Sequence, residues 1–93
     1  MDYNVAFGIA FKRLRAIKGM TQEDFASVVS ERYVRMLEKG EYAPSLTTVL
    51  DLARVLGVSP ITLVGMMQAA HSGVDLETLM QVAAKEIKSL SKA

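Results

Sequence analysis

Apolar side chains recur every three or four residues along most of this chain, which is the spacing of one face of an α-helix. The strict alternation of apolar and polar residues that is typical of strands is absent. Most apolar stretches follow a Ser, Thr or Asp, and several end at a glycine, as helices commonly do. We therefore expect an all-α protein with helices at about residues 3–18, 22–28, 31–39, 46–56, 60–71 and 76–90.

The first four of these helices each carry an apolar stripe that should face one common core. The residues expected to face inward are Phe7, Phe11, Leu14, Ile17, Phe25, Ala26, Val29, Val34, Leu37, Leu46, Val49, Leu50, Ala53 and Leu56. With the start of the helix at 60–71, they indicate a domain over residues 1–64.

Residues 65–93 form a C-terminal helical extension with an apolar stripe of its own. Its members recur at spacings of 3, 4, 4 and 3 residues, and they are Leu76, Leu79, Ala83, Ile87 and Leu90. This stripe is too long for a small domain to bury, so we expect it to join two copies of the chain in a homodimer. The alternative is that the helix folds back onto its own domain.

Composition narrows the possible functions without choosing among them. The 93 residues suffice for one small core, and about half of them are apolar, as in globular proteins. The absence of cysteine excludes disulfides and thiolate metal sites. No apolar run is long enough to span a membrane, and the first residues lack the pattern of a secretory signal peptide. We therefore expect a cytoplasmic protein without a membrane partner.

Charge and candidate catalytic groups give little further direction. The formal net charge is only +1, and seven of the 11 Lys and Arg residues precede Pro44 together with six acids. Charge alone therefore does not predict a nucleic acid partner. His71 is the only histidine, and no combination of nucleophile, base and stabilising group can be assembled around it. We expect no enzyme activity, no metal and no cofactor.

Four short motifs occur in a fixed order along the first two-thirds of the chain. They are KGMTQE at 18–23, LEKG at 37–40, PSL at 44–46 and LGVS at 56–59. With these motifs, residues 7–64 or thereabouts resemble the Cro/phage-repressor type (XRE-like) helix-turn-helix transcriptional regulators. The resemblance implies a compact five-helix lambda-repressor-like domain that binds double-stranded DNA. Its recognition helix, at about 31–39, would lie in the major groove.

The first turns of this helix supply the residues expected to read bases, which are Glu31, Arg32 and Met36. Arg32 can make a forked contact to guanine, worth about 1–3 kcal/mol of discrimination, or can instead touch only phosphate. Glu31 either accepts from cytosine or pairs with Arg35 four residues on. Met36 either contacts a thymine methyl group or packs beside the preceding helix.

A second set of residues is expected to bind phosphates or position the protein on DNA. In the family, the residue matching Gln22 contacts the backbone at a helix N-terminus, where unpaired N–H groups favour anions. The whole set is Gln22, Ser30, Tyr33, Arg35, Lys39 and Lys18. The resemblance also implies an ion pair between Arg15 and Glu38 that fixes the recognition helix.

The turn before the recognition helix differs from the family pattern. Relatives usually have a glycine between these two helices, whereas here SVVS contains none and is about two residues shorter. We expect the helix that begins at 22 to end near Val28, Val29 to be a buried corner residue, and Ser30 to cap the next helix at once. The short turn would change the tilt of the recognition helix.

The sequence therefore predicts a sequence-specific DNA-binding transcriptional regulator. We expect a repressor that binds an inverted-repeat operator as a homodimer, with its recognition helices about one DNA turn, roughly 34 Å, apart. The alternative is an antitoxin or other protein-interaction module that binds a partner such as a toxin and regulates its own operon. A small-molecule effector is left open by the sequence.

Overall fold

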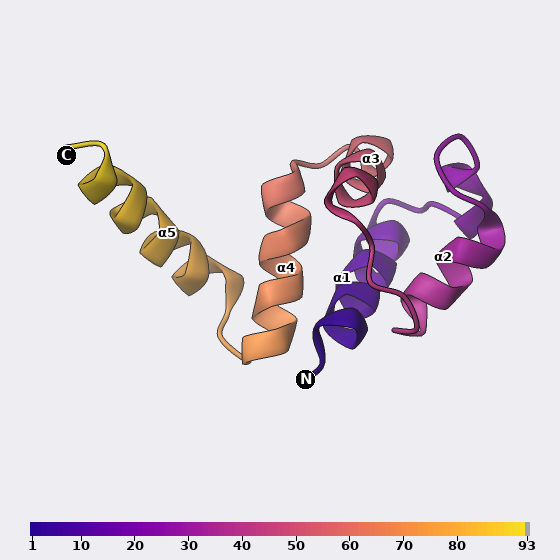
Figure 1. Ribbon diagram of the computed structural model, residues 1–93, viewed down its shortest axis with the longest axis horizontal. Coiled ribbons are helices and arrows are strands. Elements are labelled where there is room, and N and C mark those ends of the chain that lie inside the picture. Colours follow the sequence, from indigo (N-terminus) through magenta and orange to yellow (C-terminus); the bar gives the residue numbers. More distant parts are fainter. Residues whose placement is uncertain (93) are drawn as a thin grey trace.

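The computed structural model describes residues 1–92, which form a bundle of short helices (Figure 1). The elements are α1 (Tyr3–Ile17), the 3₁₀-helix η1 (Gln22–Phe25), α2 (Glu31–Glu38), α3 (Leu46–Leu56), α4 (Pro60–Ser72) and α5 (Leu76–Leu90). No strand occurs among the described residues, so the expected all-α fold is confirmed. We call residues 1–72, from α1 to the end of α4, the body.

The helices begin where short polar side chains can accept hydrogen bonds from the first free N–H groups. Ser30 accepts from Tyr33 N at 3.0 Å, and Ser45 accepts from Thr48 N at 3.2 Å. The other side-chain caps are Asp2, Ser59 and Asp75. Helices α3 and α4 end at glycines in the left-handed conformation, which explains why the sequence predicted these boundaries closely.

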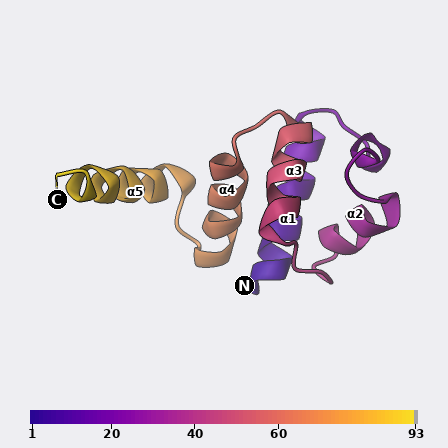
Figure 2. The same cartoon turned by 45° about the horizontal axis from the view of Figure 1, so that its top comes forward.

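The core lies wholly within the body. α1 and α4 run side by side, and η1, α2 and α3 close around them (Figures 1 and 2). Phe11 and Phe25 meet edge to face with ring centroids 5.0 Å apart, which joins α1 to η1. The largest fully buried side chains are Phe11, Phe25, Leu37, Leu52, Leu56, Leu63 and Val34.

The prediction of inward-facing residues was wrong at four positions. Ile17, Ala26, Leu46 and Leu50 are exposed, with Leu46 at 74% and Leu50 at 47%. Helix α3 instead buries Leu52 with Val49, Ala53 and Leu56. The helix carries apolar residues on several sides, so spacing alone did not select the face that meets the core.

The predicted helix at 22–28 is shorter in the structure. Regular geometry covers only Gln22–Phe25, and residues 26–28 form a turn. The N–H group of Val28 donates to the carbonyl oxygen of Phe25, three residues back, as in a 3₁₀ turn, and the N–H group of Val29 shares the same acceptor, each at 3.0 Å. Val29 is half-buried against the core, not fully buried, and Ser30 begins α2 as expected.

α5 extends away from the body and packs mainly against α4 (Figure 2). None of its residues is buried. Helices α2 and α5 lie at opposite ends of the molecule (Figure 1), whose principal extents are 44, 25 and 23 Å. Among the described residues no single helix is long and apolar enough to cross a membrane, and α3 with α4 would qualify only as a pair bent by 108°.

Candidate nucleic-acid interface

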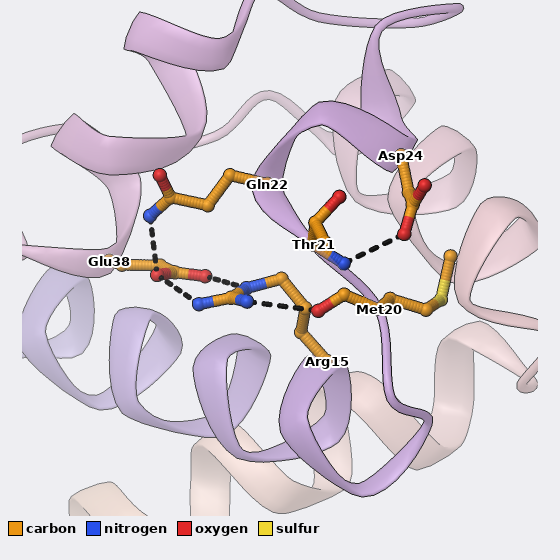
Figure 3. Close-up of polar contacts among 6 residues, drawn as sticks. All are labelled: Arg15, Met20, Thr21, Gln22, Asp24 and Glu38. Carbon is orange, nitrogen blue, oxygen red and sulfur yellow. Dashed lines mark hydrogen bonds and ion pairs between the residues drawn. The ribbon is translucent and has the colours of Figure 1, made fainter.

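An ion pair holds the C-terminal end of α2 against α1 (Figure 3). Arg15 donates from Nε to Glu38 Oε2 at 2.7 Å and from Nη2 to Glu38 Oε1 at 3.0 Å. The two side chains are only 16% and 5% exposed, and the hydrogen bonds to Glu38 raise the pKa of Arg15 above its usual value. The ion pair implied by the family resemblance is therefore present, and its two-pronged geometry fixes direction as well as distance.

The same two side chains also bind the segment between α1 and α2. Arg15 Nη1 donates to the carbonyl oxygen of Met20 at 3.0 Å, and Gln22 Nε2 donates to Glu38 Oε1 at 3.0 Å (Figure 3). The carboxylate of Asp24 accepts from Thr21 N at 2.7 Å and secures the start of η1. We call Arg15, Gln22 and Glu38 the clamp, because these side chains join α1, η1 and α2 in one hydrogen-bonded unit.

Gly8 lets α1 approach α2 more closely than any other residue would allow. A Cβ atom at this position would lie 2.5 Å from the carbonyl oxygen of Leu37 and 3.0 Å from that of Glu38. Contacts this short require the backbone to shift. Sequence reasoning missed this residue, although a glycine inside an apolar helix pattern is itself a signal of close packing.

The outer face of α2 is polar and exposed. Val34 and Leu37 are buried on its inner face, so the helical period turns Glu31, Arg32 and Arg35 outward. All three are exposed, as is Lys39 one turn further on. Arg35 pairs with Glu31, with its Nη1 3.3 Å from Glu31 Oε1, which is the pairing expected as one of the two roles of Glu31.

Two other residues expected at the interface lie at its border. Met36 is half-buried, and Tyr33 packs against the core with its ring 5.5 Å from that of Tyr42. Burial raises the pKa of Tyr33, although a hydrogen bond with Thr48 partly opposes this shift. The phenol is therefore neutral near pH 7 and can donate a hydrogen bond to a phosphate oxygen at the edge of α2.

The first residue of α2 and the first residues of η1 face a common hollow. This cavity of about 470 Å³ is lined by Arg15, Met20, Thr21, Gln22, Glu23 and Glu31. Lys18 lies elsewhere, because its Nζ is beside Gly57 in the turn between α3 and α4. The structure thus places Gln22 beside α2, next to Glu31 and Glu38, and places Lys18 apart from it.

η1 and α2 are joined by a short turn, and the exposed face of α2 is polar. Two helices joined in this way form the DNA-binding unit of helix-turn-helix proteins. Residues 11–63, more than half of the chain, match the helix-turn-helix family. The chain belongs to this family. The two helices that give the family its name correspond here to η1 and α2, and α5 lies beyond the matched residues.

Individual helix-turn-helix proteins agree with this assignment. An uncharacterized HTH-type transcriptional regulator, y4dJ of Sinorhizobium fredii, is 42% identical over 66 residues, which cover 69% of this chain and 86% of that protein. Among solved structures, the restriction-modification controller protein C.AhdI from Aeromonas hydrophila is similar, with a TM-score of 0.61 and 35% identity. That match covers 64% of this chain and 94% of that one.

Proposed function

We propose that this protein is a DNA-binding transcriptional regulator that represses promoters by occupying an inverted-repeat operator as a homodimer. Membership of the helix-turn-helix family and the HTH-type regulator among its relatives support a DNA-binding regulator. The observation that carries the proposal is the outer face of α2, which is held by the clamp and presents Arg32 and Arg35 to solvent. The protein would act in the cytoplasm, without catalysing a reaction.

In the proposed complex, α2 lies in the major groove with its N-terminal turns toward the bases. Arg32 has no acidic partner within ion-pair distance among the described residues, so its guanidinium is available for the forked contact to guanine O6 and N7. Glu31 and Met36 complete the base-reading set. Because Glu31 is paired with Arg35, it has to exchange that partner if it is to accept from cytosine N4.

Phosphate contacts would come from the border of the same face. Gln22 keeps a second N–H after its hydrogen bond to Glu38, and that N–H can donate to a phosphate oxygen. Ser30, Tyr33, Arg35 and Lys39 lie along α2 and its cap, while Lys18 would reach the backbone from a separate position. Since such contacts release counterions, the affinity should fall steeply as salt rises.

The decisive experiment is selection of bound duplexes from a random pool, followed by affinity measurements on the selected site and on random DNA. We expect Arg32→Ala to reduce the preference for the selected site by about tenfold to a hundredfold, as loss of one forked base contact does. Arg13→Ala is the matched control, because Arg13 is an exposed arginine of α1 on the side that faces Met66 and Leu76. Equal losses on both DNAs would contradict base reading by Arg32, and an unenriched pool would contradict DNA recognition itself.

The antitoxin alternative makes a separate prediction. An antitoxin would copurify at fixed stoichiometry with a partner encoded beside it, and α5, which has no buried residue, would be the surface for that partner. A regulator that needs only its own second copy would elute without another chain. Purification of the native complex and mass spectrometry distinguish the two.

A further inference from the structure

A groove lies between α1 and α4, at the end of the molecule where the turn after α4 leads into α5. Its walls come from α1, α4 and residues 73–76, and its volume is about 490 Å³. The turn and the start of α1 lie at the same end of the body in both views (Figures 1 and 2). Small-molecule sites in proteins have volumes of about 300–1,000 Å³. The groove therefore has room for a small molecule, and no residue of α2 lines it.

Alanine side chains provide the space between the two helices. Ala10 of α1 and Ala69 and Ala70 of α4 line the groove, and their methyl groups leave room that larger side chains would occupy. Ile9 and Val74 line it as well, and each is 39% exposed. Covering apolar surface of this kind is favourable because it removes that surface from water. The groove therefore favours a ligand whose larger part is apolar.

The end of the groove next to α5 is held in place by the chain itself. Gly73 has a φ of 75°, which side chains other than glycine rarely allow, and its N–H donates to the carbonyl oxygen of Ala69 at 2.9 Å. Leu76 then reaches back to α4, where its Cδ1 lies 2.7 Å from the place that a Cβ atom on Gly65 would take. The wall formed by residues 73–76 is thus already in position, which lowers the cost of binding.

Two charged residues line the groove, and only one of them is free. The carboxylate of Asp75 accepts from Thr78 Oγ1 at 2.7 Å and from Thr78 N at 3.4 Å, so both of its oxygens are engaged in capping α5. Arg13 is exposed and has no acidic partner within ion-pair distance in the described chain. A guanidinium group presents parallel N–H donors that match the two oxygens of a carboxylate. The free charge of the groove therefore favours an anionic ligand.

We propose that this groove binds a small apolar molecule that carries one carboxylate group. The carboxylate pairs with the guanidinium of Arg13, and the apolar part lies between α1 and α4 against Ala69 and Ala70. Such a ligand contacts α1, α4 and the start of α5 together, so it also strengthens the attachment of α5 to the body. The proposal does not rest on DNA binding, since the groove shares no residue with the outer face of α2.

An NMR titration of the isotope-labelled full chain tests the site, with octanoate as the probe. We expect saturable shifts centred on the amides of Ala10, Ala69 and Ala70, with a dissociation constant of about 1 mM for so few ligand atoms. Acetate, which lacks the apolar chain, and octylamine, which has the opposite charge, should bind at least about fivefold more weakly. Equal affinity for octylamine, or shifts centred on Ile61 and Val82 in the groove between α4 and α5, would overturn the proposal.

Variants test the charged and the apolar part of the site separately. Arg13→Ala should weaken octanoate binding by about threefold to tenfold, whereas Arg54→Ala, at an exposed arginine of α3, should not. Ala69→Leu fills the groove and should abolish saturable binding, whereas Ala16→Leu, at an exposed alanine of α1 outside the groove, should not. Circular dichroism checks that each variant is folded. Undiminished binding by folded Arg13→Ala or Ala69→Leu would refute the site, and exposed Arg13 decides the question if Ala69→Leu does not fold.

The two proposals fail in different experiments. A chain that enriches a specific duplex but shows no saturable octanoate shifts in the groove refutes the ligand site and leaves the DNA-binding function standing. A chain that binds octanoate as described but enriches no duplex refutes the function and leaves the ligand site standing.

Discussion

Helices α2 and α5 share an amphipathic pattern but differ in how many of their residues are buried and in which elements they contact. Both are amphipathic, and both begin at a polar cap. α2 buries Val34 and Leu37 completely and is tied to α1 and η1 by the clamp, whereas α5 has no buried residue and packs mainly against α4. α2 is held in place and exposes polar side chains, which suits it to bind a ligand. α5 has little support and exposes apolar side chains, which would be more stable if another surface covered them.

The largest expected effect of this difference is on stability. Leu37→Ala removes a fully buried side chain and should lower the free energy of unfolding by about 3–4 kcal/mol. Ile87→Ala removes an exposed side chain of α5 and should change it by less than about 0.5 kcal/mol when the protein is monomeric. Denaturant titration at low protein concentration measures both, and comparable losses would show that α5 folds into the core.

The clamp should have the next largest effect. Glu38→Ala leaves the part-buried guanidinium of Arg15 without its carboxylate, which should cost about 2–3 kcal/mol. Glu38→Gln is the matched control, since it keeps the shape and part of the hydrogen bonding and should lose less. Both variants should also weaken DNA binding at temperatures where the body is still folded, because α2 loses its fixed orientation. Unchanged DNA affinity in folded Glu38→Ala would contradict the positioning role of the clamp.

Two helical glycines test how tightly α2 and α5 pack against their neighbours: Gly8 of α1 lies against α2, and Gly65 of α4 lies against α5. Helix propensity alone predicts that Gly→Ala in a helix stabilises by about 1 kcal/mol. At Gly8 the new Cβ would meet the backbone of α2 at 2.5 Å, so we expect a net loss of about 1–2 kcal/mol. At Gly65 it would meet the side-chain end of Leu76 at 2.7 Å, which can rotate away. Thermal unfolding should therefore rank Gly65→Ala above Gly8→Ala.

The smallest expected effect is a loss of helicity at the start of α5 when the pH is lowered. Hydrogen bonds from the Thr78 hydroxyl and N–H hold the pKa of Asp75 below its usual value near 3.8. A carboxylate with a lowered pKa stabilises the folded helix above the usual value and loses that contribution as pH falls through the lower one. We expect helicity of α5 to decrease in that range. Asp75→Asn, an uncharged cap, should lack this part of the acid titration in far-ultraviolet circular dichroism.

The sequence predicted the elements whose ends are marked by local chemistry. Ser30 caps α2 as expected, and Ser45 and Ser59 cap α3 and α4 where the sequence places the starts of these helices, because a cap needs only the few residues around it. It failed where the answer depends on distant contacts. The face of α3 that is buried, with Leu52 inside and Leu50 outside, is chosen by packing against the rest of the body.

The candidate interface was predictable to a similar extent. The Arg15–Glu38 ion pair came from the family resemblance, and the Glu31–Arg35 pair from their spacing of four residues. The hydrogen bond from Gln22 to Glu38 and the close approach at Gly8 did not come from either source. Both depend on how near η1 and α1 come to the end of α2, and the shortened turn after Phe25 sets part of that distance.

The placement of α2 and α5 at opposite ends of the long axis has a consequence for the DNA itself. In the proposed dimer, copies that met at α5 would hold their α2 helices farther apart than copies that met at α3, which lies nearer to α2 in both views (Figures 1 and 2). Rotational phase requires whole turns of B-DNA between equivalent half-sites, about 34 Å each. If the protein binds an inverted repeat as proposed, the spacing of the two half-sites, counted in turns, would therefore measure where along the molecule the two copies join.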